Sequence, residues 1–231
     1  MKGCIQTMTS SFLTCYKDIS KNNYGLRNHN IDTITIHHMA GNLTIEQCGR
    51  VFRNKRACSN YGIGSDGRIA CYCYEEYAAM TSSNKNNDER AITIEVANDS
   101  LGPEWHVSSE AITSLISLCY DICIRYNIKE LIFKNDKHLV GNPYLQNVTI
   151  HSFFSATLCP GPYLLSKIPY VCEKVNNMLK CTVKDNNNNL ENNDVLYKVQ
   201  LGAFKNKEGA EKLKSELEKL GYSCIIKKER Q

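Results

Sequence analysis

The sequence lacks a long hydrophobic run. Nowhere in its 231 residues do about 18 apolar residues follow one another, so we expect no segment that spans a membrane. The first 30 residues also lack an uninterrupted apolar stretch behind basic residues, and we expect no secretory signal. The protein should therefore stay in the cytoplasm of the producing cell until another agent releases it.

The sequence also has little excess charge. Its 28 basic and 24 acidic side chains leave a net charge of +4. This excess is too weak to predict a nucleic-acid partner, but it favours an anionic one such as a cell-wall polymer or a membrane surface. The proportions of apolar residues, 42%, and charged residues, 23%, are those of an ordinary globular protein. The length fits one domain of about 150–200 residues with a smaller second one.

Cysteine, in contrast, is abundant, with 12 residues. Without a secretory signal, we interpret most of them as reduced thiols that pack as small hydrophobic groups. Cys71 and Cys73 share one face of a predicted strand, and Cys119 and Cys123 share one face of a predicted helix. Either pair could hold a metal, but core packing is the better interpretation.

Hydrophobic periodicity places the main elements. Residues 31–38 and 91–98 are rich in β-branched side chains and are predicted to form strands, the first of them central in the sheet. Asp66-Gly67 between two alternating runs predicts a hairpin turn. Apolar residues at helical spacing over four turns, beginning after Ser108 or Ser109, predict the strongest helix of the chain. We expect residues 1–31 to form an irregular arm and residues 80–90 a loop.

Two further helices are expected. One begins at Thr44, where Gln47 can close a capping box. Its basic side chains form either a solvated face or a contact with an anionic substrate: Arg50, Arg53, Lys55 and Arg56. The other helix follows Pro162, with Pro169 in its first turn.

An asparagine-rich tract divides the chain. Residues 185–194 are polar and of low complexity, which predicts a linker. We therefore expect a catalytic domain over residues 1–180, a linker over 181–195 and a small unit over 196–231. The pattern of the last unit is strand, helix and strand, a β-α-β unit too small to bury a stable core alone.

Three residues from two distant segments can form a metal site. His37 and His38 end a strand, and because neighbouring strand residues point to opposite faces, only one of them can face a given site. His151 ends a later strand, and Cys159 follows it. Two imidazoles and one thiolate are a donor set for zinc with an open position for water or a carbonyl oxygen. Alternatively, these residues are unrelated.

Three more side chains could complete the cleavage of an amide bond. Glu95 in the middle of a β-branched strand is costly unless a charge, a metal or solvent meets it, and it could act as base and then acid. Tyr61 could donate a hydrogen bond to the oxyanion. Thr157 can form hydrogen bonds but cannot carry protons at neutral pH, which makes Glu95 more necessary. An outward-facing Glu95 on an edge strand is the alternative.

The sequence resembles the zinc-dependent N-acetylmuramoyl-L-alanine amidases of the phage-lysozyme and peptidoglycan-recognition-protein type, particularly those of clostridial phages and their hosts. The resemblance spans about residues 20–178 and rests on four segments: residues 34–41, 60–67, 91–98 and 151–163.

The resemblance implies a fold, a metal and a reaction. The implied fold is α/β, with a mixed central sheet flanked by helices on both faces and a zinc groove at the sheet edge. It implies that zinc is bound by His37, His151 and Cys159, with catalytic roles for Tyr61 and Glu95. The substrate would be the muramyl peptide of peptidoglycan, cut between N-acetylmuramic acid and L-alanine. Thr157 stands where the best-known phage member has lysine, which leaves the proton path open.

The C-terminal segment resembles the start of a SPOR domain, a peptidoglycan-binding module, with only one of its two β-α-β halves. Two copies could pair into a homodimer through this unit. The sequence favours a lytic enzyme that stays in the host cytoplasm until a phage pore releases it to the wall. A bacterial autolysin of the same activity, a non-catalytic muropeptide-binding protein and a structural or storage protein are the alternatives.

Overall fold

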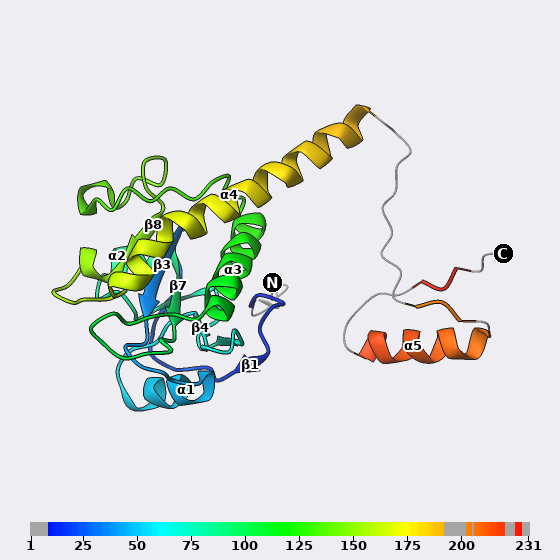
Figure 1. Cartoon of the computed structure of the whole chain (residues 1–231), viewed down its shortest axis with the longest axis horizontal. Coiled ribbons are helices and arrows are strands. Elements are labelled where there is room, and N and C mark those ends of the chain that lie inside the picture. The colour runs from blue at the N-terminus through cyan, green and yellow to red at the C-terminus, as the bar shows by residue number, and fades with distance from the viewer. Residues whose placement is uncertain (1–8, 192–201, 205, 220–224, 228–231) are drawn as a thin grey trace, which may run out of the picture. The chain divides into compact units, whose positions relative to one another are not determined.

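The computed structural model describes residues 9–191, 202–204, 206–219 and 225–227 (Figure 1). The chain forms two compact units, Met1–Asp185 and Asn186–Gln231. Among the described residues, no helix is both long and apolar enough to cross a membrane.

The first unit is built on a six-stranded mixed sheet with the strand order β1-β5-β4-β7-β3-β8. Every pair in this sheet is parallel except the β4–β5 hairpin. A separate antiparallel pair joins β2 and β6. The strands are β1 Tyr16–Lys17, β2 Asn23–Leu26, β3 Thr33–His38, β4 Tyr61–Ile63, β5 Ile69–Cys71, β6 Tyr77–Ala79, β7 Ala91–Val96 and β8 Val148–Ile150.

The two faces of this sheet differ in chemistry because its strands alternate. Ile34 and Ile36 of β3 point into the main apolar core, as do Ile92 and Ile94 of β7. The residues between them, threonines followed by His37 and Glu95, point to the opposite face. One face therefore packs the core, and the other is free to carry polar groups.

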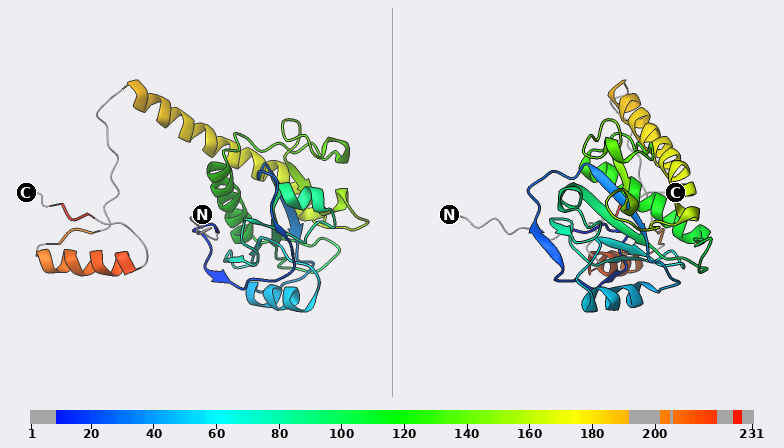
Figure 2. Two further views of the ribbon diagram at one scale, coloured as in Figure 1. Left: turned by 180° about the vertical axis from the view of Figure 1, so that it is seen from behind. Right: turned by 90° about the vertical axis from the view of Figure 1, so that its left-hand side faces the viewer.

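Helices cover both faces. The helix α3, Ser109–Tyr126, is capped by Ser108 and contributes the apolar stripe expected from the sequence to the main core, together with α4, Pro162–Glu191. The helix α1, Ile45–Asn54, starts with the predicted capping box of Thr44 and Gln47. It lies on the other side of the sheet from α3 and α4, as the right-hand view of Figure 2 shows. The predicted α/β fold with helices on both faces is confirmed.

Three local expectations were wrong. The N-terminal arm contains β1 and β2 because its backbone pairs with later strands, which a local pattern does not reveal. The expected loop 80–90 contains the short helix α2, Lys85–Arg90, because the Asn84 side chain caps Asn87 N–H. The helix α4 begins at Pro162, and Pro169 lies in its interior.

The region around the predicted linker and the C-terminal unit is only partly described. The backbone of α4 remains helical to Glu191, through the first part of the predicted linker 181–195. In the second unit, α5 spans Lys207–Lys219, and the Asn206 side chain accepts a hydrogen bond from Gly209 N–H at its start. Residues 202–204 and 225–227 have no regular structure, and the rest of the two predicted strands lies outside the described residues.

Candidate metal centre and active site

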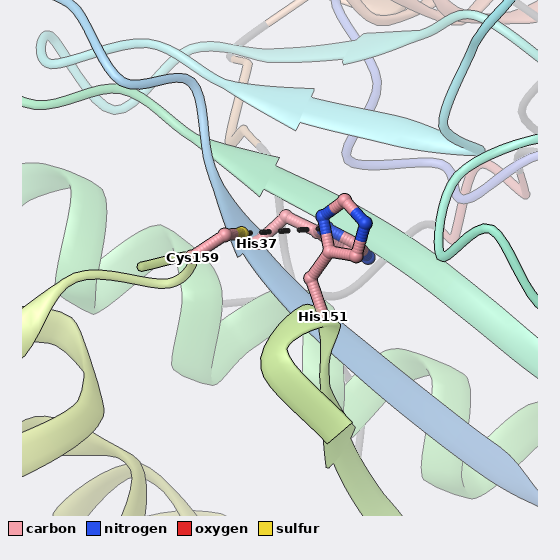
Figure 3. A group of neighbouring side chains, drawn as sticks. All are labelled: His37, His151 and Cys159. Atoms are coloured by element: carbon pink, nitrogen blue, oxygen red, sulfur yellow. Dashed lines mark hydrogen bonds between the residues drawn. The ribbon is translucent and has the colours of Figure 1, made fainter. Parts of the chain in front are cut away.

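Three side chains converge at the carboxyl ends of β3 and β8. His37 is the last residue but one of β3, and His151 opens the short 3-10 helix η2, His151–Phe153, directly after β8. Ile36 and Ile150 are register partners, so the two histidines leave neighbouring strands at the same level. Cys159 comes from the loop before α4. One potential ligand atom from each of the three lies within 4.8 Å of the others (Figure 3).

The contacts within this group are direct. The imidazole centroids of His37 and His151 are 4.9 Å apart. Cys159 Sγ lies 3.5 Å from His37 Nδ1. The sequence therefore identified three residues, 122 positions apart at the extremes, that the fold places in one cluster.

His38 is the member of the His-His pair that faces away. Its ring packs edge-on against Trp105 at a centroid distance of 5.3 Å. Its backbone N–H still points to the cluster and donates to Cys159 Sγ at 3.4 Å. A Cβ on Gly161, whose φ is +83°, would lie 3.0 Å from His38 Nδ1. The His38 ring thus lies between Trp105 and the loop that carries Cys159.

The donor set fits zinc. His37 Nε2 and His151 Nε2 are buried and have no hydrogen-bond partner. Burial, and for His37 also the neighbouring imidazoles, lowers the pKa of both rings, which favours the neutral form that binds metal. Burial raises the pKa of the Cys159 thiol. A bound dication would reverse that effect, because a coordinating thiol loses its proton.

Thr157 lies in the ligand loop. Its hydroxyl oxygen accepts a hydrogen bond from Cys159 N–H at 3.2 Å, and its side chain is exposed. A second bond, from Ser152 N–H to Cys159 O at 3.2 Å, ties the loop to the turn of His151. Thr157 therefore holds the loop, while its own O–H remains available as a donor.

Glu95 lies beside the cluster. It is the register partner of His37 on the adjacent parallel strand β7, so both side chains leave the same face of the sheet. Its Oε2 is buried without a hydrogen-bond partner. Burial raises the pKa of Glu95 to about 8. The alternative of an outward-facing glutamate on an edge strand is wrong, because β7 lies between β4 and β3.

The position of Tyr61 differs from the one predicted. Its neighbour Gly62 is the register partner of Glu95, so the Tyr61 side chain points to the opposite face of the sheet. There its hydroxyl donates to Glu75 Oε1 at 2.5 Å and accepts from Ser11 N–H at 2.7 Å. The structure does not bring Tyr61 to the metal cluster, and it does not support the predicted role as an oxyanion donor.

The network around Glu75 was not expected from the sequence. Its carboxylate is fully buried and also accepts hydrogen bonds from Tyr126, at 2.7 Å, and from Arg125 of α3. Arg125 makes an ion pair with Asp121 as well. No local pattern marks this network, because its members come from different parts of the chain.

Most of the described cysteines outside the cluster are buried. Among the described residues, nine free cysteines lie outside the cluster, of which seven are buried and two, Cys15 and Cys181, are exposed. Cys119, Cys123 and Cys172 lie in the main core, and Cys58 and Cys73 lie in the smaller core under α1.

Comparison with known families supports this geometry. Residues 27–162 match the family model described as N-acetylmuramoyl-L-alanine amidase, and residues 188–230 match that of the SPOR domain. No curated protein matches the sequence.

Solved structures share the fold at low identity. The Staphylococcus aureus hydrolase AmiA in complex with its ligand is 16% identical over 70% of this chain and 80% of its own, with a TM-score of 0.53. PlyL is 15% identical over 69% of this chain and 95% of its own, with a TM-score of 0.53. A mutant endolysin from Bacillus subtilis is 15% identical over 69% of this chain and 97% of its own, with a TM-score of 0.50.

The family match covers more than half of the chain and includes His37, Glu95, His151 and Cys159. The sheet and helices are those of the similar solved structures. The chain belongs to the N-acetylmuramoyl-L-alanine amidase family.

Proposed function

We propose that this amidase is a zinc enzyme that cleaves the bond between N-acetylmuramic acid and the L-alanine of the stem peptide. The observation that carries the proposal is the cluster of His37, His151 and Cys159, whose ligand atoms lie within 4.8 Å of one another beside Glu95. Two neutral imidazoles and a thiolate would hold zinc and leave one position open.

The residues of the chain divide the remaining work. Zinc held by these residues would act as a Lewis acid and would lower the pKa of a water molecule toward ~7. Glu95 takes a proton from the attacking water and later gives it to the leaving amine. Burial raises the pKa of Glu95, and a bound dication would lower it again toward the ionised form that the first step needs. Thr157 keeps the Cys159 loop in place and presents a hydroxyl donor at its exposed side. Tyr61 has no part in this scheme.

Mass spectrometry of digested cell wall tests the reaction. Stem peptides with a new N-terminal alanine support the proposal, and the products should disappear when a chelator removes the metal. Digestion that instead releases new sugar ends or cleaved cross-links would contradict the bond assignment. Wall binding without any product, with or without chelator, would favour a muropeptide-binding protein.

The biological role proposed is lysis of a host cell by a phage, with the enzyme in the host cytoplasm until a pore releases it. Support comes from the printed name of one structural neighbour, the mutant endolysin from Bacillus subtilis. Production of the protein only after phage induction supports this role. Production throughout growth of uninfected cells would favour the autolysin.

The C-terminal unit is proposed to bind peptidoglycan and to pair with a second copy. The match to the SPOR domain supports the binding role. Pairing is suggested by the size of the unit, 43 matched residues, which is close to the limit of about 40 residues below which a core is rarely stable alone. Light scattering of the full chain tests it, and a strictly monomeric mass at working concentration would exclude pairing.

A further inference from the structure

One side of the first unit carries five exposed cations without acidic partners. Among the described residues, none of the five makes an ion pair, whereas Arg53 pairs with Asp18 and Arg68 with Glu46. We name this surface the basic face and define it by Lys21, Arg50, Lys55, Arg56 and Lys85.

The basic face is continuous, although its residues come from three segments. Asn22 Nδ2 donates to Phe52 O at 2.8 Å and to Lys55 O at 2.7 Å, which fixes the segment after β1 against the end of α1. Lys85 Nζ lies 5.9 Å from the Tyr24 ring. Burial and then the charge of Asp88 raise the pKa of the Tyr24 hydroxyl, and the charge of Arg56 lowers it, so Arg56 also lies near Tyr24. Tyr24 therefore joins the end of α1 to the start of α2.

The basic face lies on the same side of the sheet as the metal cluster. The inner face of α1 packs on Ala70 and Tyr72 through Ile45, Cys48 and Phe52. Ala70 is the register partner of Gly62, and Gly62 is the partner of Glu95. The sheet face under α1 is thus the one that carries His37 and Glu95.

We propose that the basic face binds a linear phosphodiester polymer of the cell envelope. One guanidinium group can donate two parallel hydrogen bonds to the oxygens of one phosphate. Five cations spread over three segments fit a series of linked phosphates better than a single anion. A lipid surface is the poorer fit, because a helix that lies in a membrane interface needs exposed apolar anchors. No large hydrophobic side chain of α1 is exposed, and the exposed Ile19 and Leu26 lie on the neighbouring segment rather than on the helix. This proposal does not depend on amide cleavage.

Binding of the full-length protein to soluble poly(glycerol phosphate) tests the proposal. The test variant is Arg50→Glu/Arg56→Glu. The matched control is Lys134→Glu/Lys137→Glu, which changes the net charge equally at two exposed lysines without ion pairs in the described structure. We expect the test variant to bind roughly tenfold or more weakly, the control to bind nearly as the parent, and the affinity of the parent to fall with added salt.

Equal losses in the test and control variants would overturn the proposal, because they would show a non-specific effect of net charge. Equally tight binding to phosphatidylglycerol vesicles through the same two arginines would also overturn it in favour of a lipid surface. Inorganic phosphate should not compete at millimolar concentration if several linked phosphates are required. If Arg50→Glu/Arg56→Glu fails to fold by circular dichroism, Lys55→Glu/Lys85→Glu takes its place with the same expected loss.

Discussion

His37 and Glu95 are register partners on adjacent parallel strands, and their side chains leave the same face of the sheet. Neighbouring strands lie about 4.8 Å apart, so the carboxylate is fixed beside the predicted zinc ligand by the backbone ladder rather than by a flexible loop. The buried, unpartnered Oε2 of Glu95 is what a proton-transferring group requires.

Glu95→Gln should therefore keep the fold and the zinc but lose roughly two or more orders of magnitude in rate, since the amide cannot accept a proton. The measurement is the initial rate of wall digestion by zinc-loaded protein. Elemental analysis of the same sample provides the control. Near-full activity would remove Glu95 from the mechanism.

The two adjacent histidines should differ in their effect on metal. His37→Ala should lose stoichiometric zinc, because it removes one of three ligands. His38→Ala, the matched neighbour, should retain zinc, since its ring faces Trp105 and its contribution to the cluster is a backbone N–H. Metal per chain after dialysis measures both, and the reverse result would assign the site to His38.

Tyr61→Phe separates a structural role from a catalytic one. The change leaves the buried Ser11 N–H without an acceptor and removes one donor from Glu75. The free energy of unfolding should fall by about 1–3 kcal/mol, and kcat of the folded enzyme should be unchanged. A fall in kcat with unaltered stability in urea would return Tyr61 to the active site.

Gly161→Ala should disturb the ligand loop. An L-residue in the left-handed region costs about 1–2 kcal/mol, and here the new Cβ would also press on the His38 ring at 3.0 Å. Gly141→Ala is the control, because its φ is +92° but nothing lies within 4 Å of the added Cβ. We expect a larger loss of stability and a loss of zinc only for Gly161→Ala. Similar values in urea unfolding would mean that backbone strain alone decides.

Asp88 should make stability depend on pH. Burial raises its pKa from 3.8 to about 6, against the hydrogen bonds from Thr81 and Ser82 N–H. Because the folded pKa is the higher one, the favourable contribution is complete below about pH 4 and is lost as the pH rises through 6. At about 1.4 kcal/mol per unit, the loss is about 2–3 kcal/mol. Urea unfolding from pH 4 to 7 should show a loss of stability that is larger by this amount in the parent than in Asp88→Asn, which keeps the titration of Glu95. Parallel curves would contradict it.

Local patterns predicted the elements whose causes are local. The strand periodicity of β3 and β7, the capping box of α1 and the apolar stripe of α3 are encoded within a few turns or residues, and the structure has them. The short strands β1 and β2 depend on distant partners, and no local signal marked them.

The candidate site followed the same division. Strand alternation showed that His37 and His38 could not share a site, but only the pairing of β3 with β8 shows which of them meets His151. Tyr61 lies in β4, and the face to which its side chain points depends on the register between β4 and β7. That register determines which residue of β4 is the partner of Glu95. It depends on contacts between distant segments, which the sequence does not reveal.

The alternation of core-facing and site-facing residues along β3 also determines which mutations the fold tolerates. Ile34 and Ile36 support the core while His37 faces the other way, so core and site share one strand at intervals of a single residue. Inserting or deleting one residue before His37 would exchange the two faces. Such a change would bury the imidazole in the core and present isoleucine to the substrate. The strand therefore tolerates substitutions better than insertions or deletions of a single residue.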